Sequence, residues 1–211
     1  MGFSISWLGF RGYGIKEAAA LFGREIGDPS EIFEAPVNAY ASEKNWAIII
    51  LDPCSFPNPP QQYLAAISQE REIVIAHIEE HIMFARAELW RDGRNIWKVW
   101  HSGDKTVRDL HVTGDLPASF EALKQQCFSK QDEEDSKGTE VDLVFDLPLD
   151  LAAELTGFRH DEGSPRQRLF RTQGEACSAL RPCRAGPAIT LADSGNCSTF
   201  SGRVEPSARL H

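Results

Sequence analysis

The chain has 211 residues and carries 22 Lys and Arg against 31 Asp and Glu, a formal net charge of −9. This length predicts one domain, or one domain with a tail, and 42% hydrophobic residues are typical of a globular protein. No apolar run approaches the roughly 18–20 residues of a membrane span. The first cation is Arg11, which argues against a secretory signal, and the acidic balance argues against nucleic-acid binding. We therefore expect a cytoplasmic protein with neither a membrane nor a nucleic-acid partner.

The charge changes sign near residue 162. Residues 1–162 hold 15 basic and 28 acidic side chains, a net of −13, whereas residues 163–211 hold seven Arg, no Lys and three acids, a net of +4. The apolar residues of the second segment follow neither a helical nor a strand period. Such a segment buries too little apolar surface to offset its ordering entropy. We predict a single α+β globular domain over residues 1–162 and a disordered tail over residues 163–211.

The composition of this tail suggests a further hypothesis. Arg without Lys, together with Gly, Pro, Ala, Ser and Cys, is what GC-rich DNA yields when it is read in the wrong frame. A shift of the reading frame just after Asp161 would explain the abrupt change. The alternative is a native flexible tail, and the sequence leaves both open.

Strands are predicted where apolar residues alternate with polar ones or run continuously between turn signals. These segments are residues 3–7, 46–51, 95–100 and 109–113. Residues 73–90 are ambiguous, since as a helix they would align Val74, Ile78 and Ile82 on one face. Their β-branched start and the Asp92-Gly93 turn signal that follows favour strands.

Helices are predicted over residues 16–22, from Pro60 to Ile67, over residues 117–130 and over residues 149–155, because each combines helix formers with an apolar face or a stop signal. Residues 24–36 and the acidic run 131–138 are expected to be loops. Strands in runs with hairpin signals, and few helices, indicate an α+β fold: a predominantly antiparallel sheet with three or four helices.

His77, Glu80 and His81 match the spacing H-x-x-E-H. On a helix this spacing puts two imidazoles on one face, where they could hold Zn²⁺ while Glu80 acts as a base. In an extended strand the two imidazoles would lie roughly 13 Å apart, too far to chelate one ion. Because strands are favoured, His77 and His81 are weak metal candidates, and no cofactor is expected.

A looser set of acidic and imidazole side chains could form an acid/base site if neighbouring strands bring them together. Its members are Glu79, Glu80, His81, Asp92, His101, His160 and Asp161. The alternative interpretation is a solvated rim, which is the usual place for charged residues at strand ends.

Trp97 and Trp100 should point to opposite faces of a regular strand, so at least one of them is a candidate for a partly exposed interface anchor. The alternative is that helices cover both faces of the sheet and bury both indoles.

Three segments carry a resemblance to a group of bacterial hypothetical proteins: MGFSISW at the start, Glu79 to Gly93, and LTGFRHD from Leu155 to Asp161. The resemblance covers residues 1–161. Because the members of this group have no assigned activity, it implies a bacterial origin and a domain that ends soon after Asp161, but no catalytic residue.

These observations predict a non-catalytic cytoplasmic binding protein with an acidic surface, immunity-like or accessory, whose partner is a basic protein selected by charge complementarity. The competing prediction is an enzyme, such as a metal-dependent hydrolase, that uses the Glu/His/Asp set.

Overall fold

The computed structural model describes residues 2, 4–30, 35–52, 59–161 and 169–173. Nine strands form one sheet in the order β2-β9-β3-β4-β1-β5-β6-β7-β8, and every neighbouring pair is antiparallel. The strands are β1 (Ser4–Arg11), β2 (Glu25–Ser30), β3 (Val37–Ala41), β4 (Trp46–Leu51), β5 (Glu72–Glu79), β6 (Phe84–Arg91), β7 (Arg94–Ser102), β8 (Leu110–Gly114) and β9 (Leu169–Gln173).

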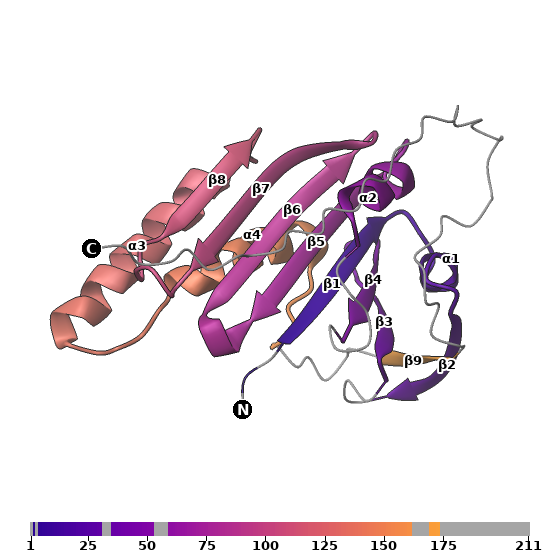
Figure 1. The fold of residues 1–211 in the computed structure, drawn as a ribbon, viewed down its shortest axis with the longest axis horizontal. Coiled ribbons are helices and arrows are strands. Elements are labelled where there is room, and N and C mark those ends of the chain that lie inside the picture. Colours follow the sequence, from indigo (N-terminus) through magenta and orange to yellow (C-terminus); the bar gives the residue numbers. More distant parts are fainter. Residues whose placement is uncertain (1, 3, 31–34, 53–58, 162–168, 174–211) are drawn as a thin grey trace, which may run out of the picture.

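Four α-helices lie on the two faces of the sheet. They are α1 (Ile15–Ala20), α2 (Gln61–Ile67), α3 (Phe120–Lys137) and α4 (Leu147–Thr156), with short 3-10 turns η1 (Glu80–Ile82) and η2 (Val144–Asp146). Figure 1 views the sheet from the side opposite α3 and α4, which lie behind strands β5–β8. The predicted α+β class, with an antiparallel sheet and three or four helices, is confirmed.

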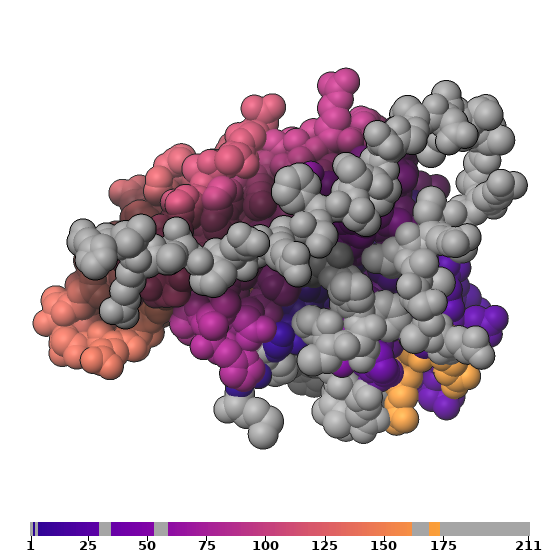
Figure 2. Space-filling model, viewed as in Figure 1, coloured from indigo at the N-terminus to yellow at the C-terminus, as the bar shows by residue number. Residues whose placement is uncertain are grey.

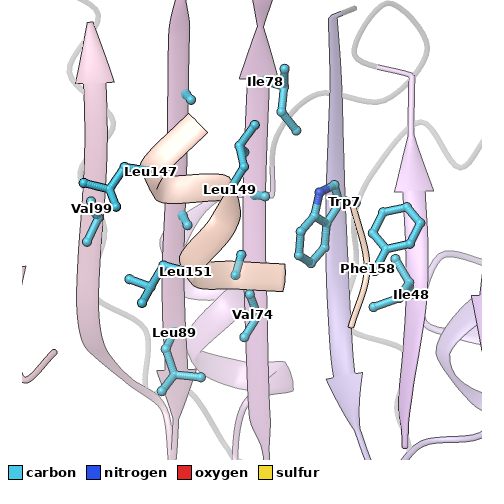
Figure 3. Close-up of a cluster of buried hydrophobic side chains, with 14 of the residues drawn as sticks. Trp7, Ile48, Val74, Ile78, Leu89, Val99, Leu147, Leu149, Leu151 and Phe158 are labelled. Carbon is cyan, nitrogen blue, oxygen red and sulfur yellow. The ribbon is translucent and has the colours of Figure 1, made fainter. Parts of the chain in front are cut away.

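The larger core lies between the sheet and the α3/α4 layer. Leu147, Leu149 and Leu151 of α4 point onto the strands, and Trp7 of β1 meets Phe158 edge to face, with ring centroids 5.4 Å apart (Figure 3). A second, smaller core packs α1 and α2 against the opposite face of β1, β3, β4 and the start of β5. Both faces of the sheet around β1 are therefore apolar.

One predicted loop and the predicted tail each contain a strand. The loop predicted over residues 24–36 contains β2, and the predicted tail contains β9, which pairs with both β2 and β3. Leu169 and Thr172 are buried there, and the Thr172 hydroxyl donates a 2.8 Å hydrogen bond to the Val37 carbonyl. A tail starting at residue 163 is thus wrong for residues 169–173, because local periodicity cannot reveal a strand whose partners lie more than 120 residues away.

The rest of the predicted tail, residues 163–168 and 174–211, lies outside the described residues. The frame-shift hypothesis stays a prediction. Because β9 lies between two strands of the sheet, residues 169–173 favour the alternative to a frame shift, that this part of the chain is native.

The acidic run 131–138 is helical to Lys137, not a loop. Gln131 is buried and holds it there: its amide donates to the Val141 carbonyl at 2.8 Å and accepts from the Leu143 N–H at 2.8 Å. The Arg108 guanidinium donates to Asp132 and Asp135, which neutralises part of the acidic run. These contacts come from outside the helix, so helix propensity alone could not predict them.

Candidate functional site

The sheet face opposite α3 and α4 changes from apolar to polar along its cross-strand rows. In one row Ser6, His77, Arg86, Trp100 and His111 stand side by side on five successive strands. Helices α1 and α2 cover this face only as far as Ile75 and Trp90. Within the described chain, the helix-covered core on this face includes only Trp90 of β6 and no residue of β7 or β8. We call the side chains of β6–β8 on this face, apart from Trp90, the open face.

Glu88 interacts with several charged and polar side chains of the open face. Its buried carboxylate accepts hydrogen bonds from the Trp90 indole at 3.0 Å and the Asn95 amide at 2.9 Å. It lies 3.2 Å from Nε of Arg86 and 3.9 Å from Nζ of Lys98. One carboxylate between two cations leaves this part of the face slightly positive, although the whole chain is acidic.

Trp100 lies on the same face and is partly exposed, whereas Trp97 is 1% exposed and belongs to the core behind the sheet. The Trp100 ring stacks on His111 of β8 at 4.7 Å, with 10° between the ring planes, and Nζ of Lys98 lies 5.1 Å from its centroid. The opposite orientation of the two indoles follows the strand alternation. Only Trp100 can therefore contact a partner.

His77 is held at the covered end of the row. Its Nδ1 lies 2.7 Å from the Ser6 hydroxyl. Burial, assisted by the nearby Arg86 charge, lowers the pKa of His77. A Ser–His pair is a feature of nucleophilic enzymes, but Ser6 is 1% exposed. The hydroxyl is thus out of reach of a substrate in this conformation.

Glu79 and His81 form a separate pair at the turn after β5. The Glu79 carboxylate accepts from the Ser4 hydroxyl at 2.5 Å and lies 2.7 Å from Nδ1 of His81. These bonds from Ser4 and His81 lower the pKa of Glu79. The group lies at one end of the central strands β1 and β5, where the His81 side chain is exposed.

His101 lies on the other side of the sheet from the open face, fully buried between β7 and the segment before η2. Its Nε2 is 2.8 Å from the Asp142 carboxylate, whose second oxygen accepts from the Phe145 N–H at 3.1 Å. This pair ties the start of η2 to β7, which is a positioning role within the fold.

His160 and Asp161 follow α4 and sit beside η1. Nε2 of His160 lies 3.6 Å from the Glu80 carboxylate, and burial lowers the pKa of His160. Next to it, the Arg159 guanidinium donates to the carboxylates of Asp146, Asp150 and Asp161. Its hydrogen bonds to Asp161 lower the pKa of that carboxyl group. Three members of the predicted catalytic set, Glu80, His160 and Asp161, come together here, and Glu80 is joined along the chain to the Glu79–His81 pair.

The zinc interpretation of the H-x-x-E-H spacing requires a helix, and that requirement is not met. His77 lies on β5 and His81 in the turn η1, so the helical alternative for residues 73–90 is wrong. In the described part of the chain, no group of three or more His, Cys, Asp or Glu side chains is arranged to hold a metal ion.

Asp92 lies far from the other predicted acids, at the β6–β7 turn. It lines a cleft of about 500 Å³ together with Arg11, Glu70, Arg71, Glu72 and Arg91. The Glu72 carboxylate joins Arg11 and Arg91 by hydrogen bonds, and these outweigh the effect of burial and lower the pKa of Glu72. With acids and arginines balanced, this cleft selects neither an anion nor a cation.

The segment that forms the α3/α4 layer carries most of the net negative charge of the chain. Residues 120–161 contain eleven acidic and four basic side chains, a net of −7, and Lys137 and Arg159 are already paired with acids of the layer. The C-terminal turns of α3 project from the body of the molecule (Figure 2). The acidic surface and the partly exposed Trp100 therefore lie on opposite sides of the sheet.

No family model, no curated protein and no solved structure matches this chain. The resemblance to bacterial hypothetical proteins, and the bacterial origin it implies, stay expectations.

Sequence reasoning missed Arg86, Glu88, Lys98 and His111. The signal that could have found them is the strand alternation of β6 and β7, which puts Arg86, Glu88, Lys98 and Trp100 on one face. The β-bulge between Leu89 and Trp90 interrupts this alternation.

Proposed function

We propose that this protein is a non-catalytic binding protein whose acidic α3/α4 layer takes up a basic protein partner. The observation that carries the proposal is the concentration of charge, −7 over residues 120–161, on one side of the sheet. Complementary potentials accelerate encounter and favour the matching partner. Several acids of the layer have exposed side chains that make no ion pair among the described residues, as in Glu121, Glu133 and Glu140.

The alternative, an enzyme built on the Glu/His/Asp set, has less support because His101 lies apart from the other members and His160, the imidazole beside Glu80, is buried. His101 is buried on Asp142, His81 pairs with Glu79, and His160 lies beside Glu80. A general acid or base must reach the reacting group together with its partners. Of the set, only the neighbourhood of His160 offers such proximity, and His160 itself is buried.

We further propose that the protein acts in the cytoplasm, as its sequence suggests. Cys127 is a free, buried thiol, which suits a reducing compartment. None of the helices in the described part of the chain combines the length and apolar character that crossing a membrane requires.

The test is capture from an extract of the source cells on the immobilised full chain, with elution by increasing salt and identification by mass spectrometry. We expect basic proteins to be retained and released by salt. The variant Glu121→Gln/Glu133→Gln/Glu140→Gln should lose most of this retention, since it removes three exposed acids of the layer.

The matched control is Glu25→Gln/Glu43→Gln/Glu70→Gln. It removes the same charge from exposed positions outside the layer and should retain the basic proteins. Equal retention by both variants, or equal loss in both, would reject the α3/α4 layer as the binding surface.

A further inference from the structure

The two edges of the sheet differ in how well they resist an additional strand. At one edge, β2 contains Pro29, which has no N–H to donate, and its register with β9 shifts between Ile26 and Pro29. Proline and irregular pairing are common ways in which proteins block edge-to-edge association. Glu25 and Asp28 add charge to this edge.

The opposite edge, β8, has none of these features. Its residues Leu110–Gly114 include no proline and no Asp, Glu, Lys or Arg, and its register with β7 is regular. Four large apolar side chains are exposed in the described chain, and Val112, at 42%, is the one that lies in a strand. This edge is therefore open to pairing.

The hydrogen bonds that flank β8 show which backbone groups point outward. The Ser102 N–H donates to the Asp109 carbonyl at 3.3 Å, and the Asp115 N–H donates to the Ile96 carbonyl at 2.8 Å. In an antiparallel pair, hydrogen-bonded and non-hydrogen-bonded residues alternate. The backbone N–H and C=O groups of the odd-numbered residues of β8 thus point toward β7. Those of Leu110, Val112 and Gly114 point away from it.

One of these outward groups is already used, because the Leu110 N–H donates to the Arg108 carbonyl at 2.9 Å. The available groups are the Leu110 carbonyl, both groups of Val112, and both groups of Gly114. This set contains both N–H donors and C=O acceptors, so the same set on a second copy of the strand can pair with it.

We propose that β8 pairs with β8 of a second copy of this chain, antiparallel, about a two-fold axis at Val112. In this register the N–H and C=O of Val112 meet the same groups of the second copy, and each Gly114 N–H meets a Leu110 carbonyl. Four hydrogen bonds form without the Leu110 N–H. A register with Leu110 opposite Val112 would need that N–H and would lose two of them.

The pairing also places the two exposed Val112 side chains next to each other on the α3 side of the joined sheet. Charge opposes it, because Asp109 comes opposite Asp115 of the second copy and the two acidic α3/α4 layers lie on the same side. Salt screens such repulsion. Dimer formation therefore increases with salt, whereas retention of a basic partner decreases.

The test is sedimentation velocity on the full chain over a range of concentrations and salt, with charged variants at the axis. Val112→Arg and Val112→Glu should each be monomeric, because residue 112 lies against itself in the dimer. A mixture of the two variants should restore a dimer. Only an axis at residue 112 produces this pattern, so a mixture that stays monomeric while the native chain dimerises would overturn the register.

A second pair of variants tests the hydrogen bonds. Val112→Pro removes an outward N–H that β7 does not use and should weaken the dimer about tenfold. Val112→Thr keeps that N–H and the β-branched shape and should stay near the native affinity. Near-ultraviolet circular dichroism checks that each variant is folded. A native chain that is monomeric at every concentration and salt, or a Val112→Pro variant with native affinity, would overturn the proposal.

Discussion

One cross-strand row of side chains runs through two halves of the sheet, and helices of the described chain cover only one of these halves. Near β1, Ile49, Leu8 and Ile75 stand side by side beneath α1 and α2. The same row continues on β6 and β7 with Glu88 and Lys98, where none of the described helices covers the sheet. The strands pair continuously in both halves, with one bulge in the open half, between Leu89 and Trp90. The difference shows that the covering layer, and not strand formation, sets which side chains the sheet can carry.

The largest effect is expected in the covered half. Ile75→Ala removes a side chain packed between the sheet and the α1/α2 layer, and we expect a loss of about 3 kcal/mol in the free energy of unfolding. Chemical denaturation monitored by tryptophan fluorescence measures it. The control is Thr113→Ala, at the open end of the same row, which should stay within about 0.5 kcal/mol of the native chain. Similar losses for the two variants would remove the distinction between the halves.

In the open half the expected effect depends on charge. Glu88→Ala leaves the Trp90 indole and the Asn95 amide without their acceptor and places Arg86 and Lys98 together uncompensated. We expect a loss of about 2 kcal/mol, measured in the same way. Glu88→Gln keeps an acceptor oxygen and should lose less. If alanine cost no more than glutamine here, the hydrogen bonds to Glu88 would not matter.

A pH effect is expected at the boundary between the halves. Burial lowers the pKa of His77 from its ordinary value of 6.5, so the unfolded chain binds this proton more readily than the folded chain does. The free energy of unfolding therefore falls as the pH drops through 6.5. His77→Gln should reduce that fall, by less than the effect of Glu88→Ala, when unfolding is compared at roughly one pH unit above and one pH unit below the ordinary His pKa.

His160→Gln is the companion variant, because burial lowers the pKa of His160 as well, on the other side of the sheet. Each variant should remove part of the acid sensitivity, and the double variant should remove more than either. An unchanged pH profile in His77→Gln would mean that His77 is as solvated in the folded chain as in the unfolded one.

The smallest effect is expected at the outer end of the open face. His111→Ala removes the ring that stacks on Trp100, and cross-strand pairs of this kind contribute about 0.5 kcal/mol. A double-mutant cycle with Trp100→Ala isolates the pair. A coupling energy well above 1 kcal/mol would make the open face as tightly packed as the covered half.

Sequence patterns predicted the elements whose signals are local. The apolar run Trp46–Leu51 is β4, the Asp92-Gly93 turn joins β6 and β7, and Gly157 ends α4. The candidate site was harder to predict from the sequence. Trp97 and Trp100 were correctly assigned to opposite faces, but which face α4 would cover depends on contacts between distant segments.

The α+β class, the antiparallel hairpins and the acidic charge follow from the amino-acid sequence alone, because periodicity, turn chemistry and composition are local or additive properties. Three features could be seen only in the folded chain: the acids of the α3/α4 layer lie on the side of the sheet opposite Trp100, His101 is buried against Asp142, and β9 joins the sheet. These outcomes depend on pairings between residues far apart in the chain. A backbone group or a carboxylate can bond to many partners, so the local sequence does not specify which partner the fold brings near.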